Sequence, residues 1–171
     1  MNINIAPISE SHAAGFHACL DAVAREKRYL AQYEAPPLER VSAFVRESVA
    51  SDVSQFVALD GSAVVGWCDI FPHWAHAVRH CGTLGIGVLP AYRGKGIGGR
   101  LLAACISKAK MNGITRITLE VRADNQPAIK LYERAGFERE AVKRKALLFD
   151  GKYYDALQMC LIWDERESAI A

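Results

Sequence analysis

Apolar residues recur along the chain at two different spacings, and these predict helices that alternate with strands. Phe16, Leu20 and Val23 follow one another at intervals of three or four residues, which is typical of one face of a helix. This helix is expected to end near Tyr29. A second helix is predicted to start at Pro36-Pro37, because proline favours the first helical turn. The side chains expected along one side of it are those of Val41, Phe44, Val45, Ser48 and Val49.

Short apolar runs predict strands, and two Asp-Gly pairs predict turns. The run over residues 3–5 indicates a first strand. The runs 56–59 and 64–67 are expected to pair as a hairpin, because Asp60-Gly61 tolerates the positive φ angles of a tight turn. Asp150-Gly151 predicts a second hairpin, the last one along the chain.

Two strand–helix units follow the first hairpin. A strand over residues 83–89 precedes a helix over 98–110, and a strand over 117–121 precedes a helix that Gly136 ends. The candidate N-caps of the latter helix are Asp124 and Asn125. Together the elements predict a mixed sheet with helices on both faces.

Composition indicates one globular domain over residues 1–171, since 51% of the residues are hydrophobic. The net charge is +2 and the basic residues are dispersed, so no nucleic-acid partner is expected. The cluster at residues 143–145 is expected to be a solvated strand or loop edge. Neither a membrane span nor a signal peptide is recognisable, which favours a cytoplasmic protein with no membrane partner. The five cysteines form no C-x-x-C pair and are expected to be buried, reduced thiols.

A basic glycine loop joins the predicted strand 83–89 to the helix that follows it. The loop carries Arg93 and Lys95, and its glycines allow successive backbone N–H groups to converge on an anion. The start of the helix adds its positive end. These features predict a pyrophosphate site. The glycines are Gly94, Gly96, Gly98 and Gly99.

Three kinds of ligand could use such a loop: a nucleoside triphosphate, a dinucleotide and coenzyme A. A nucleoside triphosphate is excluded, because Gly94-Lys95 is followed by glycine where Ser or Thr must hold magnesium. The dinucleotide pattern G-x-G-x-x-G is present over residues 94–99, and Glu120 stands at about the distance of 20 residues expected of a ribose-binding acid. However, residues 90–93 separate the strand from the glycines, whereas the dinucleotide motif turns tightly at the strand end. Coenzyme A is the ligand that remains.

The segments G-I-G-V-L-P at 85–90, R-G-K-G-I-G at 93–98 and N-Q-P-A-I-K-L-Y-E-R-A-G-F at 125–137 resemble the GNAT superfamily of acetyl-CoA-dependent N-acetyltransferases. The resemblance covers nearly the whole chain, and residues 150–159 resemble the branch that acetylates small amines and amino acids. It implies a single-domain α/β (α+β) fold with a mixed, mainly antiparallel twisted sheet, acetyl-CoA as cosubstrate, no metal, and a homodimer as a family-level expectation.

The resemblance also implies how the cofactor is held. Backbone N–H groups of the glycine loop would hold the pyrophosphate, and the pantetheine arm would lie against the strand before it. Asn125 would bind this arm, although capping the helix would explain the residue equally well. The implied cofactor-binding residues are Ile86, Gly87, Val88, Arg93, Gly94, Lys95, Gly96, Ile97, Gly98, Asn125 and Tyr132.

Two catalytic roles follow from the same resemblance. The backbone N–H of Val88 would stabilise the oxyanion, a contribution of roughly 3 kcal/mol for such a donor. Tyr132 would be the general acid that protonates the departing thiolate, unless it is only an amphipathic tyrosine at the sheet edge. Helical spacing places Tyr132 on a different side from the residues expected to form the buried face, which are Ala128, Leu131 and Ala135.

The general base is not apparent, because many relatives carry a glutamate on the strand before the loop and this chain has no acid between His80 and Leu89. Asp69, on the strand that holds Trp67, is the leading candidate. A chain of waters could also serve. The other candidates are Glu120, His73, His76 and His80. With Cys81 these histidines lack a second ligand pair at zinc spacing, so no metal is expected.

Residues 24–36 overhang the acceptor site in the GNAT fold, so Tyr29 and Arg28, with Trp67, are the substrate-binding candidates. An ordinary solvated turn is the alternative. We expect acetyl transfer to a primary amine of a small molecule, such as an amino acid, by direct attack in a ternary complex. The alternatives are acetylation of a protein N-terminus or lysine, and a non-catalytic coenzyme A sensor.

Overall fold

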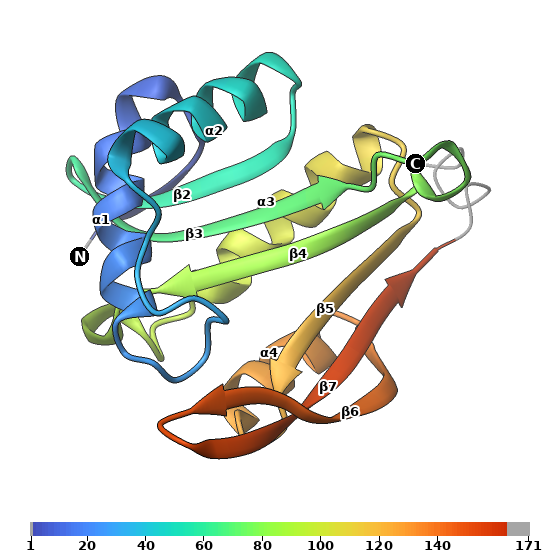
Figure 1. Cartoon of the computed structure of the whole chain (residues 1–171). Coiled ribbons are helices and arrows are strands. Elements are labelled where there is room, and N and C mark those ends of the chain that lie inside the picture. Colours follow the sequence, from blue (N-terminus) through green and yellow to red (C-terminus); the bar gives the residue numbers. More distant parts are fainter. Residues whose placement is uncertain (1, 164–171) are drawn as a thin grey trace.

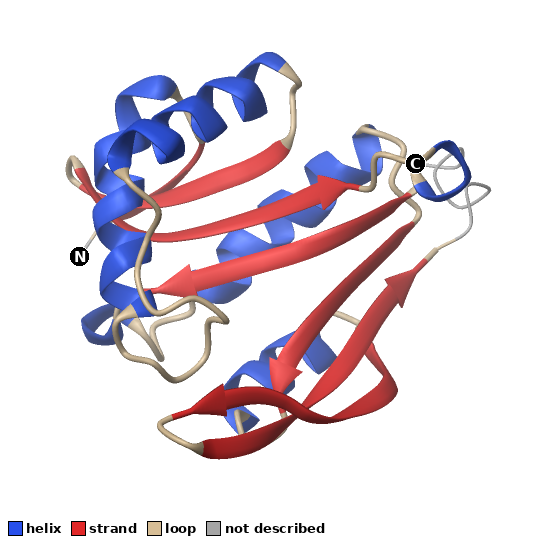
Figure 2. Cartoon of the chain, viewed as in Figure 1, coloured by secondary structure: helices blue, strands red, loops and turns tan. Residues whose placement is uncertain are grey.

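The computed structural model describes residues 2–163, which form a seven-stranded sheet with helices on both faces (Figures 1 and 2). The strand order is β1-β2-β3-β4-β5-β7-β6, and β4–β5 is the parallel pair within it. This confirms the predicted mixed, mainly antiparallel sheet. Residue 1 and residues 164–171 of the predicted domain lie outside the described residues. The strands are β1 (Ile3–Pro7), β2 (Ser54–Asp60), β3 (Ala63–Pro72), β4 (Cys81–Val88), β5 (Arg116–Arg122), β6 (Glu138–Phe149) and β7 (Lys152–Ile162).

The helices form two layers, and in Figure 1 the second layer lies behind the strands. The first layer packs on a buried cluster that includes Phe16, Val45 and Trp67, and the second packs on a cluster that includes Leu101 and Ile117. Within the described residues, no helix is long and apolar enough to cross a membrane. The first layer is α1 (Ala13–Ala24) and α2 (Leu38–Ala50), and the second is α3 (Ile97–Met111) and α4 (Gln126–Arg134).

The structure corrects two details of the predicted helices. The first helix ends at Ala24 rather than near Tyr29, because the chain turns there and Lys27 adopts a positive φ of 48°. On α2 the buried side chains include Val41 and Val45, whereas Val49 is 44% exposed. Both predicted hairpins are confirmed, with their Asp-Gly turns between β2 and β3 and between β6 and β7.

The sheet opens between β4 and β5. The two strands pair only from Cys81–Arg116 to Thr83–Thr118 and then diverge, as Figure 1 shows. On its other side β4 stays paired with β3 as far as Val88. The backbone of residues 84–88 therefore faces a gap in the sheet rather than a neighbouring strand.

Two cross-strand rows explain Gly85 and Gly87 of β4. On the face covered by α1 and α2, Trp67 lies opposite Gly87 and Asp69 lies opposite Gly85. A Cβ atom at residue 87 would overlap the indole ring of Trp67, and a Cβ atom at residue 85 would lie 2.7 Å from Oδ1 of Asp69. The side chains of β3 thus occupy the space above both glycines.

We expect Gly87→Ala to lower the free energy of unfolding by about 1–3 kcal/mol, because the rigid indole of Trp67 cannot yield to the added methyl group without shifting the backbone. Urea denaturation followed by circular dichroism measures the change. Gly99→Ala is the matched control, since its Cβ would make an ordinary contact of 3.8 Å with Leu131. Equal midpoints for the two variants would contradict the packing argument.

Candidate active site

A cleft of about 960 Å³ occupies the gap between β4 and β5. It is lined on the side of α1 and α2 by Tyr29 and Leu30, along β4 by residues 84–88, and on the side of α4 by Leu131 and Tyr132. The cleft is therefore reached from both faces of the sheet. Two reactants could enter from opposite faces and meet beside β4.

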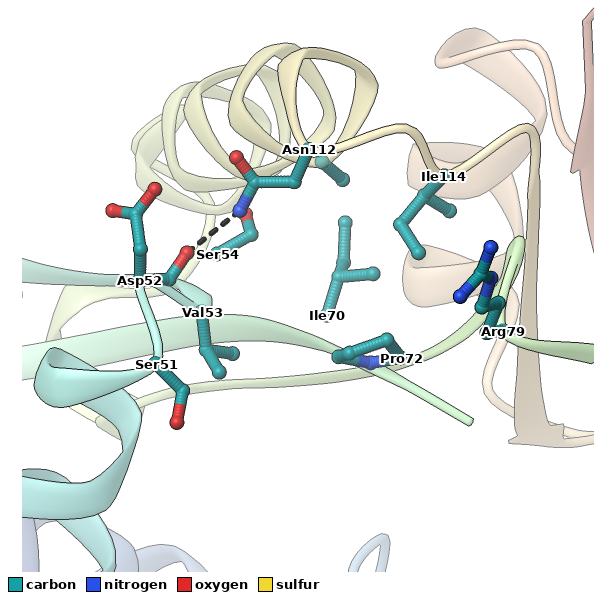
Figure 3. Close-up of a pocket in the computed structure, with 10 residues that line it drawn as sticks. Ser51, Asp52, Val53, Ser54, Ile70, Pro72, Arg79, Asn112 and Ile114 are labelled. Atoms are coloured by element: carbon teal, nitrogen blue, oxygen red, sulfur yellow. Dashed lines mark hydrogen bonds between the residues drawn. The ribbon is translucent and has the colours of Figure 1, made fainter. Parts of the chain in front are cut away.

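A second pocket, of about 310 Å³, lies at the other end of β3, close to where α2 and α3 end (Figure 3). Ile70 and Ile114 supply apolar walls, and Nδ2 of Asn112 donates a hydrogen bond of 2.6 Å to the carbonyl oxygen of Asp52. None of the predicted site residues lines this pocket. We therefore place the reaction in the larger cleft.

The glycine loop forms one end of the cleft. Gly94 and Gly96 adopt positive φ angles of 73° and 78°, and Gly96 is the N-cap of α3. Gly98 lies in the first turn, where helix N–H groups have no intrahelical acceptor. Ile97 is 2% exposed and fixes the turn to the core. The loop therefore presents backbone donors and a helix N-terminus to the cleft, which fits a pyrophosphate.

The two cations of the loop make contacts within the protein. Nε of Arg93 donates to the carbonyl oxygen of Val88 at 2.8 Å, and its Nη1 donates to Glu26 at 2.8 Å. Nζ of Lys95 donates to the carbonyl oxygen of Ala91 at 2.8 Å. Arg93 thus fixes the end of β4, and the charge of its guanidinium is balanced by Glu26.

The edge of β4 supplies further backbone donors. Leu89 N–H donates to the carbonyl oxygen of Val65 on β3 at 2.9 Å. Because successive peptide groups of a strand point to opposite sides, the N–H groups of Ile86 and Val88 point away from β3 and toward the cleft. The β4 edge can thus hydrogen-bond an extended ligand.

Tyr132 lies on the buried side of α4 with Ile129, which corrects the predicted buried face. The residues predicted for that face, Ala128, Leu131 and Ala135, are only partly buried. Tyr132 is 6% exposed and lines the cleft. Burial, with a smaller effect from the Cys68 thiol, raises the pKa of its phenol, so Tyr132 is protonated at neutral pH and can donate a hydrogen bond.

Asn125 begins α4 and also lines the cleft. Its Oδ1 accepts a hydrogen bond of 3.4 Å from the N–H of Ala128, which is the N-cap contact. The geometry is therefore compatible with both roles considered for this residue, helix capping and ligand contact.

Asp69 lies next to the cleft, with its carboxylate over Gly85. Burial raises the pKa of Asp69 to about 7, although a hydrogen bond from the N–H of Gly85 opposes the shift. Trp67, on the same strand, is 4% exposed and packs edge to face on Phe16 at 5.7 Å. Trp67 therefore shapes β4 from the core, whereas Asp69 does not itself line the cleft but lies over Gly85, which does.

The other candidate bases lie in less suitable positions. Glu120 lines the cleft but is paired with Lys143. Nε2 of His73 lies 3.0 Å from Oγ1 of Thr83, and Nε2 of His80 lies 3.4 Å from Sγ of Cys81. His76 is exposed. Over the part of the chain that the structure describes, no group of three or more His, Cys, Asp or Glu residues could hold a metal ion.

The loop between α1 and α2 (residues 25–37) reaches toward the gap, as the tan segment after α1 in Figure 2 shows. In addition to the Glu26–Arg93 pair, the hydroxyl of Tyr33 donates to the carbonyl oxygen of Leu148 at 2.8 Å. The carbonyl oxygen of Arg28 accepts a hydrogen bond of 3.0 Å from Nη1 of Arg122. The loop is thus tied to both sides of the gap. Tyr29 lines the cleft, whereas the Arg28 side chain is exposed over the Tyr29 ring.

Arg122 is a cleft residue that the sequence pattern did not single out. It is 9% exposed, it forms two hydrogen bonds with the carboxylate of Asp124, and its guanidinium lies 4.1 Å from the ring centre of Tyr154. An arginine at the end of an alternating strand resembles an ordinary exposed position. Apart from the neighbouring Asp124, its contacts come from two segments that are distant in sequence, the loop at residues 28–29 and Tyr154 on β7, so no local signal could have placed it in the cleft.

Comparisons with known proteins identify the class. Residues 17–137 match the model of the Acetyltransferase (GNAT) family, and the chain belongs to this family. A solved structure of yncA, a putative acetyltransferase from Salmonella typhimurium with its cofactor acetyl-CoA, has the same fold. Its TM-score is 0.89 at 19% identity, over 96% of each chain.

Three curated relatives are similar over part of their length. The uncharacterized N-acetyltransferase YycN of Bacillus subtilis is 38% identical over 52% of this chain and 58% of its own. N-alpha-acetyltransferase RimI of Mycobacterium tuberculosis is 38% identical over 61% of this chain and 64% of its own. L-amino acid N-acetyltransferase AaaT of Escherichia coli is 32% identical over 64% of this chain and 68% of its own. The chain thus spans less than two thirds of YycN and RimI, and the named acceptors differ.

We expect Gly96→Ala to weaken acetyl-CoA binding roughly tenfold, because a side chain costs about 1–2 kcal/mol in the left-handed region and the loop would have to rearrange. Isothermal titration calorimetry measures the affinity. Gly113→Ala is the matched control, since Gly113 has a φ of 79° and also has open space around it, but follows the other end of α3. Similar losses of affinity in both variants would mean that the effect is general destabilisation.

Proposed function

We propose that the protein transfers the acetyl group of acetyl-CoA to a primary amine of a small molecule, with an amino acid or an amino-acid analogue as the leading class. The observation that carries the proposal is the divergence of β4 from β5. It leaves one continuous cleft that runs from the glycine loop along the β4 edge to Tyr132. Acetyl-CoA supplies an activated acyl thioester when it is bound.

The binding role belongs mainly to the backbone. N–H groups of residues 94, 96 and 98 would hold the pyrophosphate, and the peptide groups of Ile86 and Val88 would pair with the pantetheine amides. The Val88 N–H would also donate to the thioester carbonyl as negative charge develops on its oxygen. Arg93 supports this geometry, because it holds the carbonyl of the same residue. A positioned donor of this kind contributes roughly 3 kcal/mol.

Tyr132 would donate a proton to the departing thiolate. Its raised pKa by itself opposes this step, since ordinary phenols already have a pKa of about 10 against about 8.5 for thiols. However, burial also raises the pKa of a thiol, as it does for Cys68 beside Tyr132. A thiolate that forms within the same buried region is therefore a stronger base than it is in water, and the two pKa values stay comparable.

Asp69 would accept the proton that the acceptor ammonium must lose before it attacks. A base with a pKa of about 7 is partly ionised at neutral pH and can hold the proton it receives. Gly85 has no side chain between Asp69 and the cleft, so the transfer can occur across it, directly or through one water molecule.

The acceptor class is inferred from the loop between α1 and α2. This loop is tied to both sides of the gap and lines the cleft with Tyr29 and Leu30, which favours a small amine over a folded protein as the acceptor. Arg28 and Lys27 are exposed on it, whereas Glu26 is neutralised by Arg93, so a carboxylate on the acceptor is favoured. The similarity to AaaT supports the same class, and the similarity to RimI supports the alternative of a peptide N-terminus.

A thiol-release assay with acetyl-CoA tests the acceptor class. We expect kcat/KM for at least one free amino acid or analogue to exceed that for short peptides by about tenfold or more, a difference of about 1.4 kcal/mol in transition-state binding. Polyamines and aminoglycosides serve as amines that lack the carboxylate. Preference for a peptide N-terminus would favour the alternative acceptor.

We expect Asp69→Asn to lower kcat roughly 10²-fold or more and to abolish the inflection near pH 7 in the acid limb of kcat/KM. The wild-type rate should rise with pH through this value, because only the carboxylate accepts a proton. The variant should be more stable than the wild type at pH 8. The raised pKa means that ionisation of the folded protein costs stability as the pH rises from about 4 to about 7. An unchanged acid limb would exclude Asp69 as the base, and acetyl-CoA affinity is the control.

A further inference from the structure

Gln55 on β2 is a buried polar residue that the reaction described above does not use. It is 1% exposed, and neither Nε2 nor Oε1 has a hydrogen-bond partner among the described residues. A buried polar group without a hydrogen-bond partner destabilises the folded protein, and an apolar side chain of similar size would avoid this loss. The carboxamide is therefore expected to have a role that offsets this cost.

The register of the sheet places Gln55 beside Asp69. Gln55 pairs with Asp69 on β3, and Asp69 pairs with Gly85 on β4. Directly opposite residues have Cβ atoms about 4.5–5.5 Å apart, so the carboxamide and the carboxylate are within reach of one water molecule. On the other side, Gln55 is joined through its backbone to the apolar Ile8. Asp69 is thus the polar side chain next to Gln55 in this row, and the row ends at the cleft.

We propose that Gln55 is a positioning residue for acetyl transfer: its carboxamide holds the carboxylate of Asp69 over Gly85 through a bridging water molecule. This rests on the proposed function, in which Asp69 is the base. Nε2 of Gln55 would donate to this water, and the water would donate to the carboxylate, which stabilises the ionised form of Asp69. Gln55 is too deeply buried to touch a substrate, so its effect passes through Asp69.

Few other groups around Asp69 could change the pKa of its carboxyl. Trp67 and Phe71 flank it on the same face of β3, and Phe44 of α2 lies against Phe71 with ring centres 5.0 Å apart. From β4 it receives the N–H of Gly85. The titratable group that responds to its charge is the thiol of the neighbouring Cys68, whose backbone carbonyl oxygen accepts a hydrogen bond of 3.0 Å from Sγ of Cys105. No charged side chain is among the causes of the Asp69 pKa shift.

The test compares Gln55→Met with the wild type, since methionine has a similar length but cannot donate the hydrogen bond. The first readout needs no acceptor: the Asp69 carboxyl is titrated by NMR in protein labelled with ¹³C-aspartate. We expect its midpoint to move to higher pH by about one unit in Gln55→Met, because the ionised form loses a donor. A midpoint that does not move would overturn the proposal.

The second readout is the pH dependence of kcat/KM with the best acceptor of the panel. The acid limb should move with the NMR midpoint, so that Gln55→Met loses rate several-fold at pH 7 and recovers it at high pH, with acetyl-CoA affinity unchanged. Tyr132→Phe is the control that lowers the rate without moving this limb. If Asp69→Asn leaves the acid limb of kcat/KM unchanged, Asp69 is not the base and the proposed function fails at this point. If Asp69→Asn removes the limb but Gln55→Met does not shift it, only the role of Gln55 fails. A purely structural Gln55 would change the urea midpoint and leave both titrations unchanged.

Discussion

The candidate site depends on the separation of β4 from β5. In a continuous sheet every peptide group of β4 would be paired on both sides, and the strand could offer nothing to a ligand. Here β3 holds β4 along one edge and β7 holds β5 along the far edge, while direct pairing between the two central strands covers only three residue pairs. The gap is therefore maintained by the strands on either side of it, and the cost of unpaired backbone groups is reduced because they face a solvent-filled cleft.

The same strand shows how packing restricts the sequence around this gap. Glycines at 85 and 87 are commonly associated with flexibility, but here they are required by volume, since Asp69 and Trp67 lie above them. The two rows have different consequences. The row through Trp67 fills the core and fixes the position of β4, whereas the row through Asp69 places a partly buried carboxyl next to the cleft. A carboxyl with a pKa near 7 destabilises the folded protein at neutral pH, which is a cost typical of functional groups.

Much of this arrangement could be predicted from the sequence. Periodicity identified the helices, the two Asp-Gly pairs identified both hairpins, and the glycine loop identified the end of the cleft, because these signals are local. The prediction of the buried face of α4 was wrong, because Ile129 and Tyr132 lie toward the core in place of Ala128 and Leu131. The side of a helix that faces the core is determined by the strands it packs on, and the sequence of the helix alone does not give it. Arg122 and Gln55 could not be recognised, because their surroundings come from strands and loops that are distant in sequence. Arg93 was recognised, but its contact with Glu26 was not.

The division of labour between backbone and side chains follows from this geometry. The groups proposed to bind the cofactor and stabilise negative charge are peptide N–H groups, whose positions are fixed by the sheet and by the first turn of α3. Peptide N–H groups do not change their protonation state with pH, and they require no particular side chain. Proton transfer cannot be performed by the backbone, so the proposed mechanism assigns it to Tyr132 on the α4 side of the gap and to Asp69 on the α1–α2 side. In that mechanism an amine that enters from the α1–α2 side would meet the base first and the thioester second, which is the order that direct attack requires.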